Sequence, residues 1–246
     1  MTAAREDPGT VALEFDYQNL NERPLSPFTA LSRALHPGVR RVAAQIDPYA
    51  VEWQARNAAA MSCDEPLWVV LGDSLSQGIG ASCFAGGWVP RCSAILSASG
   101  FDHRIVNFSF SGARIGDVID RQLPAMERWR LRPALTTVLI GSNDIIRREL
   151  RVCLRERFAH MLTLLPPGSL VASMPRANGP LGTLDELIEA AGPELGLVAV
   201  PLVLASNRRA EDYWHPNDEG YATLADVFFE AITMHGPAAI RSPSTC

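Results

Sequence analysis

Short apolar stretches alternate with amphipathic stretches along the chain from about residue 65 onward. The apolar stretches consist largely of Val, Ile and Leu and lack the alternation of a half-exposed strand, so they predict strands buried on both faces. These strands are Leu67 to Leu71, Ile105 to Phe110, Thr136 to Ile140, Leu170 to Ser173 and Leu197 to Leu204. The stretches between and after them predict helices at Trp88 to Ser99, Asp117 to Trp129, Ile145 to Leu165, Leu184 to Ala191 and Asn217 to Met234. Five such β-α units predict an α/β fold with a five-stranded parallel sheet between two layers of helices.

Residues 1 to 65 do not follow this alternation. A polar stretch, Gln18 to Arg23, precedes helical patterns at Phe28 to Leu35 and Ala50 to Met61. We therefore expect an N-terminal helical extension, residues 1–65, which packs on or caps a catalytic domain of residues 66–246. Two roles stay open for the extension: it covers one side of the sheet, or it forms a lid over the site.

The composition is that of a globular domain, with 246 residues of which 47% are hydrophobic and 20% charged. No lysine occurs in the sequence, which excludes Schiff-base enzymes, the Walker A lysine and Ser-x-x-Lys acylases. The formal net charge of −5 provides no basic field for a phosphate backbone, so we expect no nucleic-acid partner.

The spacing of the cysteines bears on metal binding, and the residues at the N-terminus bear on the cellular location. The five cysteines form no Cys-x-x-Cys pair, so we expect no metal site. The stretch from Met1 to Tyr17 carries acidic residues and no apolar run of signal-peptide length, and no apolar stretch is long enough to span a membrane. These features favour a cytoplasmic protein in a reducing compartment.

Candidate chemistry begins at Ser74, which follows the first predicted strand directly. Open α/β sheets bind ligands at the carboxyl ends of their strands, and a serine hydroxyl there is either a nucleophile or a helix cap. A nucleophilic serine needs a base within reach and a third group that orients the base. His215 follows the last predicted strand, and Asp212 lies three residues earlier on the same loop. These two residues are the best candidates for base and orienting acid.

Two further loops leave the same edge of the predicted sheet. Gly112 lies in the loop after the second strand, where it allows close backbone approach, and Asn143 follows the third strand with a side-chain amide. Each is able to donate to a developing oxyanion, and each has a structural alternative, a tight turn at Gly112 and a helix N-cap at Asn143.

Taken in chain order, Ser74, Gly112, Asn143 and His215 resemble the four blocks of the SGNH, or GDSL-type, hydrolase family. The resemblance covers residues 66 to 236 and includes the literal tetrapeptide Gly-Asp-Ser-Leu, a Gly-x-Asn-Asp block and an Asp-x-x-His block. It implies a three-layer, flavodoxin-like fold with Ser74 as nucleophile, His215 as base and Asp212 as its orienting partner. It further implies an oxyanion hole formed by the N–H groups of Ser74 and Gly112 together with the Asn143 amide.

The residues before the first block depart from this pattern, because the family's nucleophile block normally lies near the N-terminus. The larger α/β-hydrolase family fits less well, since no Gly-x-Ser-x-Gly elbow surrounds Ser74. The Gly78-x-Gly80 pair suggests a dinucleotide site, but Cys83 stands at the sixth position of that fingerprint. A carbohydrate- or nucleotide-binding domain without catalysis remains an alternative.

The acyl acceptor distinguishes an esterase or lipase, which uses water, from an acyltransferase, which uses an alcohol. The size, extension and lysine-free composition are similar to those of mycobacterial-type octanoyltransferases within the family. That similarity implies an octanoyl-CoA-type donor as co-substrate, a glucosylglycerate-type acceptor and no bound cofactor. The oligomeric state is left open. Near the site loops we expect four substrate-binding residues: Trp88, Arg114, Ile145 and Trp214.

Overall fold

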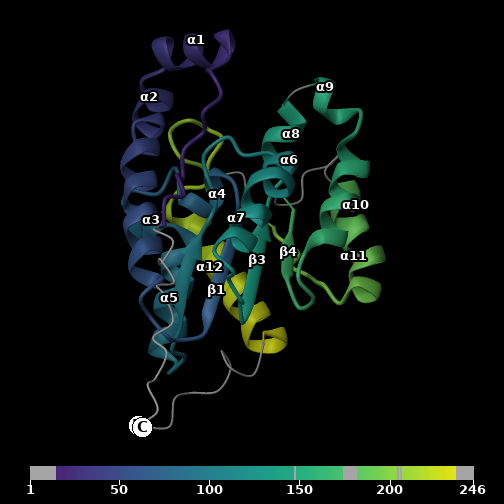
Figure 1. Cartoon of the computed structure of the whole chain (residues 1–246). Helices are drawn as coiled ribbons and strands as arrows, with labels where there is room; N and C mark the ends of the chain where they lie inside the picture. Colours follow the sequence, from purple (N-terminus) through teal and green to yellow (C-terminus); the bar gives the residue numbers. More distant parts are fainter. Residues whose placement is uncertain (1–14, 147, 174–181, 204, 206, 237–246) are drawn as a thin grey trace, which may run out of the picture.

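The computed structural model describes residues 15–146, 148–173, 182–203, 205 and 207–236. At its centre lies a sheet of five parallel strands in the order β2-β1-β3-β4-β5 (Figure 1). The strands are β1 (Leu67–Gly72), β2 (Arg104–Asn107), β3 (Leu135–Leu139), β4 (Leu170–Ala172) and β5 (Val198–Ala199). The predicted α/β fold with a five-stranded parallel sheet is therefore confirmed.

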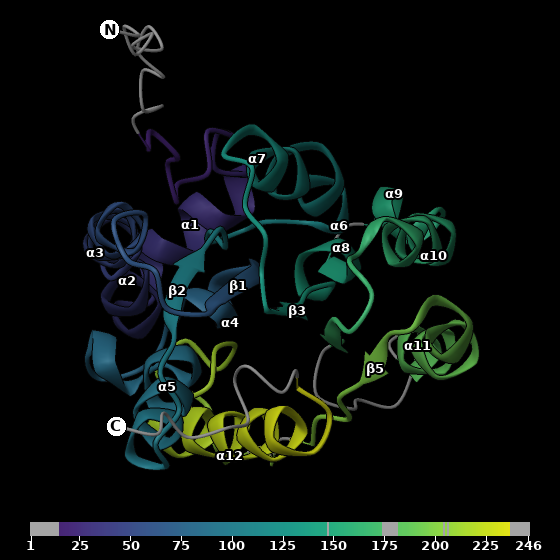
Figure 2. The same cartoon turned by 60° about the horizontal axis from the view of Figure 1, so that its bottom comes forward.

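Helices cover both faces of the sheet, as Figures 1 and 2 show. One face packs against α5 (Trp88–Ala98) and α12 (Asp218–His235), which also contact each other. The other face packs against α7 (Leu123–Arg128), α10 (Leu154–Leu164) and α11 (Gly182–Leu195). The sheet thus has a separate apolar core on each side.

Strand β1 shows how the sequence forms both cores at once. All six of its residues are buried, and Trp68 and Val70 join the core under α5 and α12, whereas Val69 and Leu71 join the opposite core. Burial of each such side chain contributes roughly 1.5–3 kcal/mol. The buried indole N–H of Trp68 donates to Thr137 Oγ1 on β3 at 2.9 Å, so its polar atom is satisfied as well.

Several predicted elements differ from the structure, among them β2, which ends at Asn107 instead of Phe110. The single helix predicted at Ile145 to Leu165 is wrong, because a turn at Val152 and Cys153 separates α10 from the stretch that holds α8 (Ser142–Ile146) and α9 (Arg148–Arg151). The fully buried apolar side chains of this stretch belong to α10, whereas Ile145 of α8 is only partly buried, so periodicity identifies α10 and not the turn before it. Strand β5 is shorter than predicted, because it ends just before Val200 and Pro201, and proline has no N–H to donate to a ladder.

The predicted helix at Asp117 to Trp129 also differs, since it begins earlier and changes its winding. The chain passes through α6 (Ile115–Asp117) and a π-helical turn, η2 (Val118–Gln122), before it reaches α7. The last helix agrees closely with its prediction, and Asn217 is its N-cap, accepting from the Gly220 N–H at 3.0 Å. In the described part of the chain, no helix has both the length and the apolar character needed to cross a membrane.

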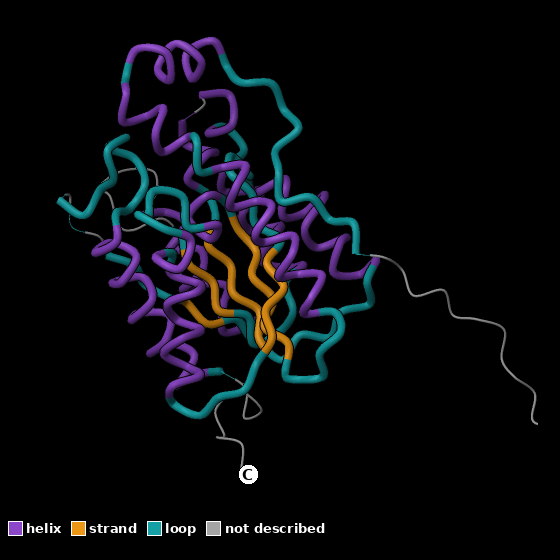
Figure 3. Tube along the Cα trace, turned by 90° about the vertical axis from the view of Figure 1, so that its left-hand side faces the viewer, coloured by secondary structure: helices purple, strands orange, loops and turns teal. Residues whose placement is uncertain are grey.

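The N-terminal segment runs over the edge of the sheet at β2. It forms α1 (Pro27–Leu35), α2 (Pro37–Ala43) and α3 (Ile46–Ala60), of which α2 is not predicted by the sequence pattern. Asn57 on α3 pairs with the backbone of Asn107 through both its amide nitrogen and its amide oxygen, at 2.8 and 2.7 Å. In Figure 3 the helices of this segment lie on the outside of the strands, and the described N-terminal residues continue as a loop along the same side.

Candidate active site

The carboxyl ends of β1, β2 and β3 lead into one group of loops and short helices. In Figure 1, α4 (Ser74–Gln77), α6 and α8 gather at the same end of the sheet. Strand order reverses at β1, because the chain proceeds outward to β2 and then returns to β3 on the opposite side. Ligand sites of open parallel sheets form at this kind of switch point.

The nucleophile candidate Ser74 is held by the turn between β1 and α4. Gly72 has φ +154°, and a side chain there would meet the carbonyl oxygen of Leu139. The side-chain amide of Gln122 bonds both the N–H and the carbonyl of Gly72, each at 2.8 Å. Asp73 then caps α4 by accepting from the Leu75 N–H at 2.9 Å. As a result Ser74 occupies the first position of α4, with only 3% of its surface exposed.

Ser74, His215 and Asp212 form a continuous relay. Ser74 Oγ lies 2.9 Å from His215 Nε2, and His215 Nδ1 lies 2.5 Å from Asp212 Oδ2. When Nδ1 carries the proton that is donated to Asp212, Nε2 is free to accept the proton of the serine hydroxyl. The structure thereby brings together the three residues that the sequence suggested for nucleophile, base and orienting acid.

The Asp212 carboxylate is kept ionised by its surroundings. Burial acts to raise its pKa, but hydrogen bonds from His215 and from the backbone N–H groups of Trp214 and His215 outweigh burial and lower the pKa. An ionised Asp212 stabilises a protonated imidazole beside it, which is the state that a general base reaches in mid-reaction.

Asp212 and His215 both lie on a short hairpin. Arg209 and Pro216 form an antiparallel bridge, and the Ala210 N–H donates to the carbonyl of His215 at 2.8 Å. Tyr213, at the tip, has φ +59° and 88% of its surface exposed. The turn leaves Asp212 and His215 on the side of the hairpin that faces α4.

Gly112 and Asn143 lie close to one another on neighbouring loops. Gly112 has φ +80°, and within the described residues neither its N–H nor that of Ser74 donates to a protein acceptor. The amide nitrogen of Asn143 donates to the carbonyl of Ala113 at 2.8 Å and lies 3.4 Å from Asp73 Oδ2. Asn143 therefore joins the Gly112 loop to the nucleophile turn, and two free backbone N–H groups are available beside it.

Two buried carboxyl groups lie behind these loops. Burial raises the pKa of Asp73 to about 6, although hydrogen bonds from Ser142 and from the Leu75 N–H act in the opposite direction. Burial likewise raises the pKa of Asp144 to about 6, opposed by a hydrogen bond from the Ile115 N–H. Asp144 thus ties α8 to the start of α6, and Asp73 ties α4 to α8.

The four residues expected to bind substrate lie in different environments. Trp88 is a correction: its side chain is fully buried in the core, with its ring stacked on Phe228 at 4.0 Å between centroids. Ile145 is partly buried against the opposite core. The Arg114 backbone N–H caps α6 through Asp117, and the positive charge of its side chain partly opposes the rise that burial causes in the pKa of Asp144. Trp214 follows Tyr213 on the hairpin and is 38% exposed, which leaves its ring accessible.

The glycines of the suggested dinucleotide fingerprint serve the fold instead. Gly78 ends α4 with φ +90°, and Gly80, with φ +106°, packs against the His215 loop. The role of Gly80, and that of Gln122 behind Gly72, were not foreseen. A glycine pair directly after the nucleophile turn is a signal of close backbone approach, whereas nothing local marks Gln122.

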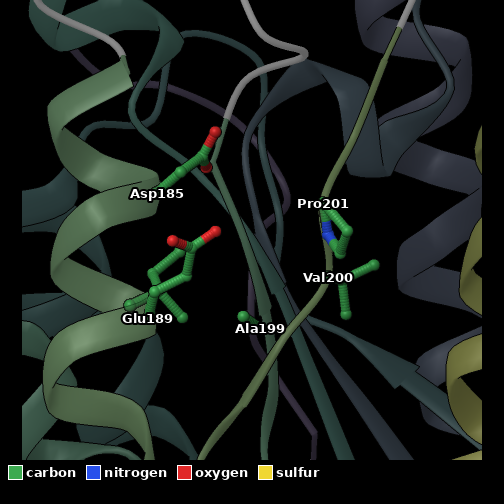
Figure 4. Close-up of a pocket in the computed structure, with 6 residues that line it drawn as sticks. Asp185, Glu189, Ala199, Val200 and Pro201 are labelled. Carbon is green, nitrogen blue, oxygen red and sulfur yellow. The ribbon is translucent and has the colours of Figure 1, made fainter.

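A small pocket lies apart from this relay, between α11 and the end of β5 (Figure 4). Its lining residues are Asp185, Ile188, Glu189, Ala199, Val200 and Pro201. None of them belongs to α4 or to the hairpin that carries His215. Among the described residues, His, Cys, Asp and Glu side chains form no group of three or more suited to a metal ion.

Comparisons with known proteins agree with this arrangement. The sequence profile of the GDSL-like Lipase/Acylhydrolase family matches residues 70–223, more than half of the chain. The esterase TesA of Pseudomonas aeruginosa is 34% identical over 93 residues, which are 38% of this chain and 45% of that esterase. The alignment thus spans about half the length of this relative.

Solved structures show the same fold at low sequence identity. A crystal structure of TesA has a TM-score of 0.59 at 23% identity, covering 68% of this chain and 98% of TesA. A lipase/acylhydrolase from Enterococcus faecalis has a TM-score of 0.59 at 17% identity, covering 74% and 100% of the two chains. An acetylxylan esterase from Geobacillus stearothermophilus has a TM-score of 0.53 at 18% identity, covering 72% and 97%.

Proposed function

Since the chain belongs to the GDSL-like lipase/acylhydrolase family, we propose that it transfers acyl groups through a covalent acyl-Ser74 intermediate. The observation that carries the proposal is the unbroken relay from Ser74 through His215 to Asp212, with spacings of 2.9 and 2.5 Å. A serine hydroxyl is a weak nucleophile unless a base accepts its proton, and the relay supplies that base.

The reaction has two halves. Ser74 Oγ attacks the carbonyl carbon of an ester or thioester while His215 Nε2 takes the hydroxyl proton, and the carbonyl oxygen becomes an oxyanion. The N–H groups of Ser74 and Gly112 stabilise that charge, and the Asn143 amide joins them by exchanging its long bond to Asp73 Oδ2, 3.4 Å, for one to the oxyanion. The tetrahedral intermediate collapses, His215 protonates the departing alcohol or thiol, and the acyl group stays on Ser74.

The second half regenerates the enzyme. A hydroxyl compound attacks the acyl-Ser74 carbonyl, His215 removes its proton, and the proton returns to Ser74 Oγ as the product leaves. Water as the acceptor makes the enzyme an esterase. An alcohol makes it an acyltransferase, and the residues around Ser74 are the same in both cases.

For the acceptor we propose a sugar hydroxyl of a glucosylglycerate-type compound, with an octanoyl-CoA-type thioester as donor. The support is the similarity of size, extension and composition to octanoyltransferases of the family, together with a structural feature. Residues 15–60 lie outside the family match yet reach the Gly112 loop and the His215 hairpin. An additional segment beside the site offers surface for an acceptor larger than water.

Product analysis tests this proposal. The enzyme is incubated with octanoyl-CoA, with and without diglucosylglycerate, and the products are identified by mass spectrometry. We expect an octanoylated glycan from the wild type and none from Ser74→Ala. Free octanoate formed at an acceptor-independent rate, with no acylated glycan, would identify an esterase instead.

Ser76→Ala is the matched control. Ser76 lies on the same short helix, is equally buried, and its hydroxyl has no hydrogen-bond partner within the described residues. This variant should retain the activity of the wild type. A folded Ser74→Ala variant with wild-type turnover would refute the acyl-serine mechanism.

A further inference from the structure

The loop that carries Gly112 is held from outside the family domain. The side-chain amide of Asn21 donates to the carbonyl of Ser111 at 3.2 Å, and the guanidinium of Arg23 donates to the carbonyl of Gly112 at 2.8 Å. Both residues belong to the N-terminal segment, which precedes the family match by more than forty residues. They therefore contact the two consecutive peptide groups on either side of the Gly112 Cα atom.

The first of these peptide groups is the one that matters for the oxyanion. The carbonyl of Ser111 and the N–H of Gly112 belong to the same planar trans peptide and point in opposite directions. A donor that fixes the Ser111 carbonyl consequently fixes the direction of the Gly112 N–H. It also polarises the amide, which strengthens the N–H as a donor at its other end.

Asn21 itself has a defined orientation. The Arg23 N–H donates to Asn21 Oδ1 at 3.0 Å, so the oxygen of the side-chain amide faces its own backbone and the nitrogen faces Ser111. The contact is close enough that a Cβ on Gly112 would lie 2.6 Å from Asn21 Nδ2. Glycine at position 112 is thus required both by φ +80° and by the side chain that lies against it.

Arg23 anchors the same arrangement to the body of the domain. Its guanidinium pairs with both oxygens of Asp117, at 2.7 and 2.8 Å, and Asp117 also accepts from the Arg114 N–H at 2.7 Å. Asp117 is mostly buried, with 15% of its side chain exposed. A two-pronged pair of this kind restricts the guanidinium more than a single contact does.

From this geometry we propose that Asn21 is a positioning residue for the oxyanion hole, acting through the Ser111–Gly112 peptide, with Arg23 fixing the next peptide. The inference rests on the proposed acyl-serine function and adds a requirement to it. The N-terminal segment is a fixed part of the active site, in contrast to a cover for the sheet alone or a lid that opens and closes.

The test uses the full chain with Asn21→Ala and Asn21→Leu; the second variant keeps the branched outline of the side chain but has no donor. Hydrolysis of p-nitrophenyl octanoate is measured for each. We expect kcat/KM to fall by about tenfold to a hundredfold, which is less than the loss on deleting an oxyanion donor outright. Thermal unfolding monitors whether each variant is folded.

A pair of inhibitors distinguishes a loss of oxyanion-hole positioning from a general loss of ligand binding. An octyl trifluoromethyl ketone forms a hemiketal oxyanion with the serine, whereas the methyl ketone of the same chain length resembles the bound substrate. The Ki of the trifluoromethyl ketone should rise in parallel with the loss of kcat/KM, because both depend on the oxyanion. The Ki of the methyl ketone should change by less than about twofold, because it develops no such charge.

Asp16→Asn is the control from the same segment. Asp16 forms an exposed pair with Arg128 at 2.8 Å and touches neither loop of the site. It should match the wild type in all three measurements. Asn21 variants that also match a fully active wild type, or that weaken both ketones equally, would overturn the inference alone. A wild-type chain that neither hydrolyses the ester nor binds the trifluoromethyl ketone would overturn the proposed function, and this inference with it.

Discussion

Gly80 lies against His215 so closely that a Cβ on Gly80 would be 2.7 Å from the Cβ of His215 and 2.5 Å from the carbonyl oxygen of Pro216. Real Cβ atoms do not approach other atoms to these distances, so the loop after α4 and the hairpin that carries His215 meet only because position 80 is glycine. The Gly80 N–H is also bound, to Gln45 Oε1 at 2.7 Å. His215, the proposed base, is therefore held by backbone contact as well as by Asp212.

Gly80→Ala tests this contact. The added methyl group must push the His215 loop away from Ser74, so we expect kcat/KM to fall by about tenfold or more, since small misplacements of catalytic groups are costly. Gly168→Ala is the matched control, because Gly168 also has positive φ, +83°, but no atom lies within 4 Å of its Cβ position. The control should lose only about 1 kcal/mol of stability and keep its activity. Equal activities of the two variants would contradict the contact.

Asp212→Asn tests the orienting carboxylate. The amide oxygen is still able to accept from the Trp214 and His215 N–H groups, but the amide nitrogen then faces His215 Nδ1 and favours the wrong tautomer. By analogy with the serine-protease relay, kcat should fall by roughly 10⁴. Glu211→Gln, one residue earlier and exposed, should have little effect on kcat. Turnover above one tenth of the wild-type rate in a folded Asp212→Asn would show that Asp212 is dispensable.

The two tryptophans that the sequence places near the substrate, Trp88 and Trp214, are separable by experiment. Trp88→Ala removes a ring packed in the core and should cost about 3–5 kcal/mol of unfolding free energy, measured by urea denaturation. Trp214→Ala removes a partly exposed ring on the hairpin and should change stability by less than about 0.5 kcal/mol. If Trp214 binds substrate, as the sequence suggests, and contacts the acyl chain, its loss raises KM for octanoyl esters more than for acetyl esters. An unchanged ratio of the two KM values would remove Trp214 from the binding surface.

Ionisation of Asp73 should lower the free energy of unfolding as the pH rises. Its pKa in the folded state is about 6, above the value of about 3.9 for an unfolded chain. The folded state therefore binds the proton more tightly, and this contribution to stability is complete below about pH 3.9 and is lost as the pH rises through about 6. Between pH 5 and pH 7.5 the loss amounts to roughly 1.4 kcal/mol.

Asp73→Asn cannot ionise and isolates this contribution. The free energy of unfolding of the wild type and of the variant is measured by denaturant titration at both pH values. The wild type should lose roughly 1.4 kcal/mol more than the variant on going to pH 7.5. Parallel pH dependence of the two proteins would mean that the pKa of Asp73 is not raised in the folded state.

Much of the fold and the core of the site follow from local sequence. The central strands β1, β3 and β4 are recognisable because each is a short stretch rich in apolar side chains that is buried on both faces, whereas the outer strands β2 and β5 are partly exposed. Ser74 is recognisable because it comes directly after such a run. Asp212 and His215 are recognisable as a pair because three residues on one loop keep them within reach of each other, and their observed contact confirms that this spacing suffices.

Other features depend on contacts between distant parts of the chain. The sequence does not show that Trp88 is buried against Phe228, because a tryptophan at a helix start has the same neighbours in the chain whether it faces a core or a groove. It predicts one helix where α8, α9 and α10 form, since the apolar period of α10 is the only strong signal there. These are matters of packing between elements, which no window of local sequence contains.

The site shows the same division. The sequence by itself determined which residues are candidates for the chemistry, because a nucleophile, a base and an acid are matters of residue type and of position after a strand. Only the tertiary structure decided that His215 lies 2.9 Å from Ser74 across 141 residues of chain, and that Asn21 holds the Ser111–Gly112 peptide across 90. Contacts between residues so far apart in the sequence depend on the order of the strands in the sheet and on how closely the glycines let the loops approach. Both are properties of the folded chain.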